Sequence, residues 1–286
     1  MTNKIPPGDL SDVSETMLMI LYARALESRR PDALIHDPRA EELLARIDYD
    51  FARFRINADD QVIPGLRLQQ LDRMARAFMA AHPDGVVVHI GCGLDTRFDR
   101  VDNGQVLWYD LDLPPVIDLR RKLLEETPRY KMIASSVLDL AWLDGVDVHP
   151  GKSFLFVAEG VLMYFSEAEV RRLVLALRER FPGAELAFDA ARPLLMWLYN
   201  LAFRLRHLDA RLRWPLRPYD ALEAWAPGIQ LLEAWDLTSL EEFPSRRKRL
   251  RTLVRLFPSL AKMGAVLHYR LGESSRTEPS TRGETV

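Results

Sequence analysis

The chain has 286 residues, of which 48% are hydrophobic and 28% are charged, a balance typical of a globular protein. This length suffices for one well-filled domain with a modest lid, but not for two ordinary domains of independent function. The formal net charge of -2 does not attract the chain to a polyanion, so we do not expect nucleic acid as a partner. The single cysteine, Cys92, cannot form an internal disulfide, and we therefore expect a cytoplasmic location.

Residues 1–82 are expected to form a helical cap in front of the main domain. Between residues 15 and 28, apolar side chains recur at spacings of three and four, which predicts an amphipathic helix that carries Arg24. A second helical segment, residues 65–78, carries Arg67 and leads into the first apolar run. This cap is a candidate lid over a ligand site in the domain that follows, which we place at residues 83–286.

The stretch VVVHIGCGLDTRFDR, residues 86–100, predicts a strand, a glycine turn and the start of a helix. Gly91 and Gly93 let the backbone approach a ligand closely, and the unpaired N–H groups at the start of the helix carry partial positive charge. Asp95 or Thr96 is placed to cap this helix. The alternative is an ordinary strand-to-helix turn in an α/β domain that binds no nucleotide.

A second apolar run ends in Asp110 and Asp112, where carboxylates would hold the hydroxyl groups of a ribose. A dinucleotide fingerprint needs a third Gly or Ala, and Thr96 stands in its place. Asp95 would also repel a pyrophosphate. The pattern therefore favours S-adenosylmethionine, which carries a ribose and positive charge but no phosphate, over a nicotinamide dinucleotide.

The rest of the domain alternates between short β-type runs and helical segments, which predicts a mostly parallel sheet with helices on both faces. Seven strands are predicted, at residues 86–90, 105–109, 130–134, 154–158, 185–189, 230–235 and 265–269. Glu159 and Tyr164 follow the fourth of these strands, at the edge of the sheet where α/β proteins bind ligands.

Residues 190–228 depart from this alternation and are predicted to form an inserted lid, in which aromatic and apolar residues are mixed with arginines. The most apolar part, residues 194–203, is too short to span a bilayer, so stable membrane insertion is not expected. It remains open whether this segment is core or lid, or whether it touches lipid or an apolar substrate. Residues 245–255 predict an amphipathic helix, and residues 273–286 predict a disordered tail.

Three motifs in order, GCGLDTRFDR, YDLDLPPVIDLRRKLL and AEGVLMYFSEAEV, resemble those of the leucine carboxyl methyltransferase family, which includes bacterial O-methyltransferases of the tetracenomycin polyketide type. The resemblance runs from residue 14 to the final HYRLG. It implies a Rossmann-like class I methyltransferase sheet of seven strands with one antiparallel strand. It also implies S-adenosylmethionine as the cofactor.

The resemblance assigns roles to individual residues. Arg67 occupies the position of the arginine that pairs with the cofactor's carboxylate, and Arg24 that of a basic partner from the N-terminal helix. Glu159 takes the place that faces the cofactor's ammonium group. Ser136 and Val137 fall where the family contacts adenine. The family usually has an Asp at the position of Ser136, whereas here the carboxylate comes three residues later.

These features predict an O-methyltransferase that acts on a carboxyl or hydroxyl group of a small molecule, such as a polyketide or another secondary metabolite. A carboxylate is already ionised and needs no general base, whereas a phenol would benefit from a base or a nearby cation. Tyr164, Asp189 and Arg192 are the candidates for that chemistry. No cluster of metal-ligand type is apparent in the sequence, and no metal is expected.

Three other functions are less consistent with the sequence. A protein C-terminal carboxyl methyltransferase would need a groove for a peptide tail, and this compact sequence has no extra insertion for one. A non-enzymatic cofactor-binding module is disfavoured because the glycines and the charged site residues are all present. A nicotinamide-dependent dehydrogenase is disfavoured by Thr96. The oligomeric state and the identity of the methyl acceptor are left open.

Overall fold

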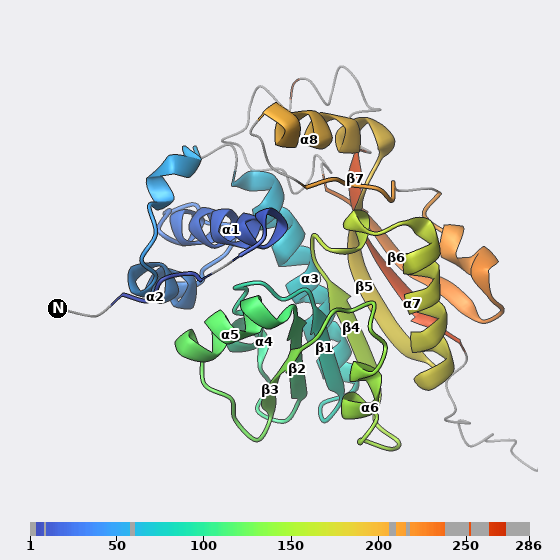
Figure 1. The fold of residues 1–286 in the computed structure, drawn as a ribbon. Coiled ribbons are helices and arrows are strands. Elements are labelled where there is room, and N and C mark those ends of the chain that lie inside the picture. The colour runs from blue at the N-terminus through green and yellow to red at the C-terminus, as the bar shows by residue number, and fades with distance from the viewer. Residues whose placement is uncertain are drawn as a thin grey trace, which may run out of the picture.

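One mixed sheet forms the centre of the molecule (Figure 1). The computed structural model describes residues 4–8, 10–57, 61–205, 210–215, 218–237, 252 and 263–272. The sheet has seven strands in the order β3-β2-β1-β4-β5-β7-β6. Their bounds are β1 Val86–Ile90, β2 Leu107–Asp112, β3 Tyr130–Ala134, β4 Phe154–Ala158, β5 Ala184–Ala191, β6 Ile229–Asp236 and β7 Gly264–Leu271.

Strand directions confirm the expected topology. Strands β3, β2, β1, β4 and β5 run parallel, and β7 lies between β5 and β6, antiparallel to both. The last strand of the chain is therefore inserted antiparallel, as the family resemblance implied. The carboxyl ends of the five parallel strands share one edge, which is where ligands bind in open α/β sheets.

The second strand differs from its predicted range of residues 105–109. β2 runs from Leu107 to Asp112, so both aspartates belong to the strand instead of following it. Asp110 and Asp112 are in register with Met132 and Ala134 of β3. The strand continues through these charged positions because the side chain of Asp110 is paired with Arg120 inside the protein.

Helices cover both faces of the sheet, as predicted. Residues of α3, α4 and α5 pack against one face, and residues of α6 and α7 pack against the other. The helices pack against buried apolar residues of the strands, whose side chains point alternately to the two faces of the sheet. The helix bounds are α1 Asp12–Ser28, α2 Pro38–Arg46, α3 Val62–Ala81, α4 Arg97–Val101, α5 Pro114–Leu123, α6 Trp142–Val146, α7 Glu167–Arg180 and α8 Pro193–Leu205, with 3-10 turns η1 Phe51–Phe54, η2 Leu162–Tyr164 and η3 Ala221–Trp225.

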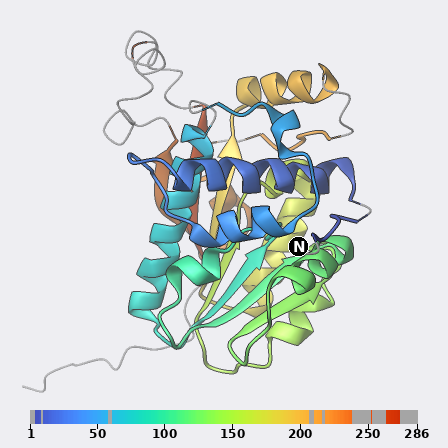
Figure 2. The same ribbon diagram turned by 90° about the vertical axis from the view of Figure 1, so that its left-hand side faces the viewer.

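The N-terminal helices and α8 lie at the carboxyl edge of the parallel strands (Figures 1 and 2). Helix α1 begins three residues earlier than predicted because the side chain of Ser11 caps it by accepting the N–H of Ser14. A Cβ built on Gly93 would lie 3.1 Å from Met17 Cβ, so α1 closes directly over the glycine loop. Helix α8 follows β5 at the same edge.

Part of the predicted lid is described. The apolar segment, residues 194–203, is helical within α8, and Leu194, Trp197, Leu198 and Tyr199 are exposed on it. Among the described residues, no helix combines the length and the apolar character needed to cross a bilayer. The helix predicted at residues 245–255 lies outside the described residues except for Thr252, and the predicted tail at residues 273–286 lies outside them entirely.

Candidate functional site

The glycine turn after β1 has the geometry that the sequence predicted. Gly91 and Gly93 have φ of +63° and +50°, a region that favours glycine. A Cβ on Gly91 would lie 2.2 Å from Val161 Cγ2, so no larger residue fits there without displacement of the loop after β4. Thr96 is the N-cap of α4, but its side chain makes no capping hydrogen bond. Its hydroxyl instead donates to Asp37, a correction to the predicted capping role.

The two aspartates of β2 occupy different environments. Asp112 lies at the end of the strand, where its Oδ2 accepts the N–H of Gly93 at 2.7 Å and burial raises the pKa of its carboxyl. Asp110 is fully buried and accepts hydrogen bonds from Arg120, from Tyr130 Oη at 2.6 Å and from Trp108 Nε1 at 2.9 Å. The structure therefore brings Asp112 to the glycine loop and places Asp110 in an interior ion pair.

Arg67, Glu159 and Asp189 meet at the carboxyl edge, although they come from α3, the end of β4 and β5. Arg67 Nε lies 3.0 Å from Glu159 Oε1, and Arg67 Nη1 lies 3.0 Å from Asp189 Oδ2. Asp189 Oδ1 also accepts the N–H of Gly160 at 2.5 Å. Burial raises the pKa of Asp189, and Arg67 opposes that rise. Three residues predicted from separate motifs thus form one charged cluster.

Arg24 does not reach this cluster directly. It is buried, and its guanidinium donates to Asp95 Oδ1 at 2.5 Å and to the carbonyl of Leu94 at 2.6 Å. In the structure, its side chain therefore fixes the glycine loop to α1. Its predicted role as a basic partner of the cofactor stays a prediction.

A buried network of charges lies behind the glycine loop, and sequence reasoning missed most of it. Arg97 is completely buried and contacts Asp72 at 2.8 Å, and its guanidinium also donates to Glu159. Arg100 contacts Asp95 at 2.8 Å. The network consists of Arg24, Asp37, Asp72, Asp95, Arg97 and Arg100 and is linked to Glu159.

The arginines of this network keep the carboxyls of Asp95 and Asp72 ionised. Burial opposes ionisation of Asp95, but Arg100, Arg24 and Arg97 together hold its pKa well below the usual range. Asp72 shows the same balance between burial and two arginines, and its pKa is lowered. Because buried charges are tolerated only when paired, these contacts fix the position of the loop on α3.

One signal in the sequence points toward this network. Asp72 falls among apolar positions of its helix that recur at helical spacing, including Leu68, Leu71 and Ala75. A carboxylate on such a buried stripe requires a cationic partner. The sequence does not say which arginine supplies it, since Arg97 is 25 positions away.

Ser136 and Val137 follow β3, as the resemblance required for an adenine contact. The hydroxyl of Ser136 accepts the N–H of Leu138 at 3.3 Å, and Val137 is buried. The carbonyl of Val137 accepts Trp142 Nε1 at 3.1 Å. Asp139 accepts the N–H of Ala141 at 3.3 Å and stabilises the turn before α6. Ser136 and Val137 lie at the carboxyl edge of the sheet, and their contact with adenine stays a prediction.

The three candidate catalytic residues are not all together. Burial raises the pKa of Tyr164, and the charges of Arg67 and Asp189 also influence it. The ring of Tyr164 packs against a small apolar cluster that includes Ala191 and Met196. The guanidinium of Arg192 lies 5.7 Å from the ring centre of Tyr219. Within the described residues, no group of three or more potential metal ligands is arranged to hold a metal ion.

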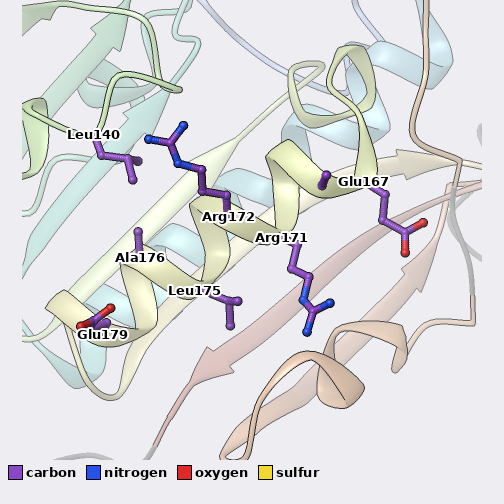
Figure 3. A pocket seen from close by; sticks show the side chains of 8 residues that line it. Leu140, Glu167, Arg171, Arg172, Leu175, Ala176 and Glu179 are labelled. Carbon is purple, nitrogen blue, oxygen red and sulfur yellow. The ribbon is translucent and has the colours of Figure 1, made fainter.

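A shallow groove elsewhere on the surface contains none of the predicted site residues (Figure 3). It follows the exposed side of α7 from Glu167 to Glu179 and includes Leu140 from the loop after β3. Both charged and apolar side chains line it. It therefore does not belong to the candidate site at the carboxyl edge.

The chain is similar to known proteins over most of its length. The model of the leucine carboxyl methyltransferase family matches residues 17–177. A tetracenomycin polyketide synthesis O-methyltransferase from Streptomyces glaucescens is 39% identical over 229 residues, which cover 80% of this chain and 84% of that protein. An S-adenosyl-L-methionine-dependent methyltransferase from Gibberella zeae is 28% identical, covering 78% of this chain and 82% of that protein.

Solved structures share the fold at low sequence identity. A DUF574 family protein from Streptomyces avermitilis superimposes with a TM-score of 0.57 and 16% identity, covering 89% of this chain and 96% of that one. A protein from Thermobifida fusca gives a TM-score of 0.53 and 17% identity, covering 87% and 94%. At this level of identity, the likeness extends to the arrangement of strands and helices.

Proposed function

The chain belongs to the leucine carboxyl methyltransferase family and is a methyltransferase that depends on S-adenosylmethionine, and on that premise we propose that it methylates an oxygen atom of a small molecule. The acceptor group is a carboxyl or a hydroxyl, carried by a polyketide or another secondary metabolite. The observation that carries the proposal is the cluster of Arg67, Glu159 and Asp189 at the same edge as the glycine loop.

The residues at this edge fit the cofactor in charge. Gly91 and Gly93 form a tight turn in which Val161 and Met17 already lie against the Cβ positions. Asp112 accepts the N–H of Gly93 and would accept hydrogen bonds from ribose hydroxyls. Glu159 offers a carboxylate to an ammonium group, and Arg67 offers a guanidinium to a carboxylate. The bound cofactor supplies a methyl group on a positively charged sulfur.

The protein contributes to the reaction by positioning the acceptor against the methyl group and by excluding water. Methyl transfer requires the acceptor oxygen to approach the methyl carbon in line with the bond that breaks. Helix α1 closes over the glycine loop, and Thr16 of this helix hydrogen-bonds the side chain of Tyr164. We propose that α1 and α8 enclose the acceptor and exclude water from the site.

The relative from Streptomyces glaucescens supports oxygen as the acceptor atom, because its name describes an O-methyltransferase. The apolar and aromatic side chains exposed on α8 support an apolar acceptor, since they lie at the same edge of the sheet. A protein carboxyl terminus is less well supported because the groove along α7 contains none of the predicted site residues.

Transfer of a labelled methyl group tests the proposal. The chain is incubated with methyl-labelled S-adenosylmethionine and a panel of phenols and carboxylic acids, and the label is followed into the product. A methyl ester releases methanol in mild base, whereas an aryl methyl ether keeps its label, so the two acceptor classes are separated. Label found only on nitrogen or carbon would contradict the proposal.

A further inference from the structure

His89 is a buried polar residue of β1 that the proposed function leaves without a role. Only 1% of it is exposed. On the neighbouring strands, it is in register with Asp110 of β2 and Val157 of β4. Val157 belongs to the core on the face of the sheet that α3 and α4 cover, so His89 lies inside the protein and contacts the residues of those helices.

The contact of His89 with Arg97 fixes which of its ring nitrogens carries the proton. Nη1 of Arg97 lies 3.1 Å from Nε2 of His89. A guanidinium has donors and no acceptor, so Nε2 accepts, and the imidazole is neutral with its proton on Nδ1. Nδ1 faces the carboxylate of Asp110 at 3.6 Å, which favours the proton on that nitrogen.

Arg97 is held through all three of its guanidinium nitrogens. Its Nε donates to Asp72 at 2.8 Å, its Nη1 to His89, and its Nη2 to Oε2 of Glu159. Because the guanidinium is rigid and planar, the contacts with Asp72 and His89 determine where Nη2 points. Oε1 of Glu159 accepts from Arg67, so the two arginines together set the orientation of this carboxylate.

The two arginines differ in their access to a ligand. The side chain of Arg67 is 17% exposed, whereas that of Arg97 is completely buried. A ligand at the carboxyl edge can therefore reach Arg67 directly. Arg97 can influence the ligand only through the carboxylate of Glu159.

The loss of His89 would leave Nη1 of Arg97 as a buried donor without its acceptor, which is costly. A second acceptor lies within reach of a small rotation. Oδ2 of Asp95 makes no hydrogen bond with the described residues, and it lies 3.3 Å from Nη2 of Arg97 and 4.0 Å from Nε2 of His89. A guanidinium that turns toward Asp95 would no longer hold Glu159 in its present orientation.

We propose that His89 is a positioning residue, which keeps Arg97 on Glu159 and thereby orients the Glu159 carboxylate toward the ammonium group of the bound cofactor. This inference rests on the proposed function, because it requires the cofactor to contact Glu159. His89 acts through Arg97 and transfers no proton.

Two ligands that differ only in the ammonium group test this role by calorimetric titration of the full chain. S-adenosylhomocysteine has the group, and its deaminated analogue keeps the carboxylate but lacks it. The unaltered chain should bind S-adenosylhomocysteine more tightly than the analogue. H89L should weaken S-adenosylhomocysteine about tenfold, since a buried hydrogen bond is lost, and leave the analogue unchanged. A merely structural role of His89 would instead weaken both ligands by the same factor.

Two further variants assign the effect to the acceptor atom at Nε2. H89Q supplies an amide oxygen near that position, so it should restore the preference for S-adenosylhomocysteine. H89N is too short to reach Arg97 and should behave as H89L does. H268L is the matched control, because His268 pairs with Glu185 at 2.8 Å away from the site. Its preference should equal that of the unaltered chain.

The outcomes separate the two proposals. Failure of the unaltered chain to bind either S-adenosylmethionine or S-adenosylhomocysteine would overturn the proposed function and this inference together. Binding of S-adenosylhomocysteine with an unchanged preference in H89L, or equal losses for both ligands, would overturn the positioning role alone. If H89L does not fold, H89N and H89Q decide the question, and equal preferences in these two variants would contradict the proposal.

Discussion

Asp112 accepts the backbone N–H of Gly93 at 2.7 Å, although the two residues are 19 positions apart in the chain. This hydrogen bond joins the end of β2 to the glycine loop after β1. Burial raises the pKa of Asp112, and hydrogen bonds donated to its carboxylate, as by Gly93 and Leu113, oppose that rise. The pair therefore marks where the ribose of the cofactor is expected to sit.

Replacement of Asp112 by Ala is expected to weaken cofactor binding by about 1–3 kcal/mol, because charge-assisted hydrogen bonds to the ribose are lost. Calorimetric titration with S-adenosylhomocysteine measures the change. D102A serves as the control, since Asp102 is paired with Arg129 on the surface, away from the loop. Equal affinity in D112A and the unaltered chain would remove the ribose assignment.

Gly91 is expected to tolerate no side chain. In G91A, the new Cβ would lie 2.2 Å from Val161 Cγ2, so the loop must move and cofactor binding should be lost. Gly104 is a matched control, because it also has positive φ but has nothing within 4 Å of its Cβ position. G104A should cost only about 1 kcal/mol of stability from backbone strain and leave binding unchanged. Urea unfolding and calorimetry give both quantities; similar effects of the two substitutions would argue against a tight loop.

Replacement of the buried Arg97 is expected to lower the free energy of unfolding strongly. R97M removes a cation that Asp72, Asp95 and Glu159 share, and it leaves buried carboxylates without full compensation. The expected loss in the free energy of unfolding is about 3–5 kcal/mol. R129M, which breaks a partly exposed pair, should cost about 0–1 kcal/mol. Urea denaturation compares the two variants, and losses of the same size would show that the buried network does not support the fold.

Acid should weaken the same network. The pKa of Asp95 is held well below its usual range, so its stabilising effect is complete above the unfolded-state pKa of about 4 and is lost as pH falls toward the folded-state pKa. The difference in unfolding free energy between the unaltered chain and D95N should therefore shrink as pH drops below about 4. Urea unfolding at neutral and acidic pH measures it. A difference that does not change with pH would contradict the pairing.

The sequence was sufficient to predict the strand-and-helix alternation, because apolar runs and glycine turns are local signals. The antiparallel insertion of β7 came from the family resemblance, since no local pattern encodes strand order. β2 was predicted too short because Asp110 looks like the end of a strand until Arg120 and Tyr130 are seen to hold it.

Pairings across the fold could not be read from the sequence. Arg67 and Asp189 are 122 positions apart, and only the packing of α3 against the sheet brings them together. Arg192 is a candidate from the sequence for a cation at the acceptor, and the structure places its guanidinium beside Tyr219. Buried arginines such as Arg97 resemble surface charges until their partners are known.

The most direct measurement is a calorimetric titration of the full chain with S-adenosylmethionine, S-adenosylhomocysteine and NAD, side by side. We expect micromolar binding of the first two ligands and none of NAD, because Asp112, Glu159 and Arg67 suit a nucleoside joined to an amino acid and Thr96 replaces the third glycine of a dinucleotide fingerprint. Binding of NAD with comparable affinity, or of none of the three ligands, would contradict the assignment of this site.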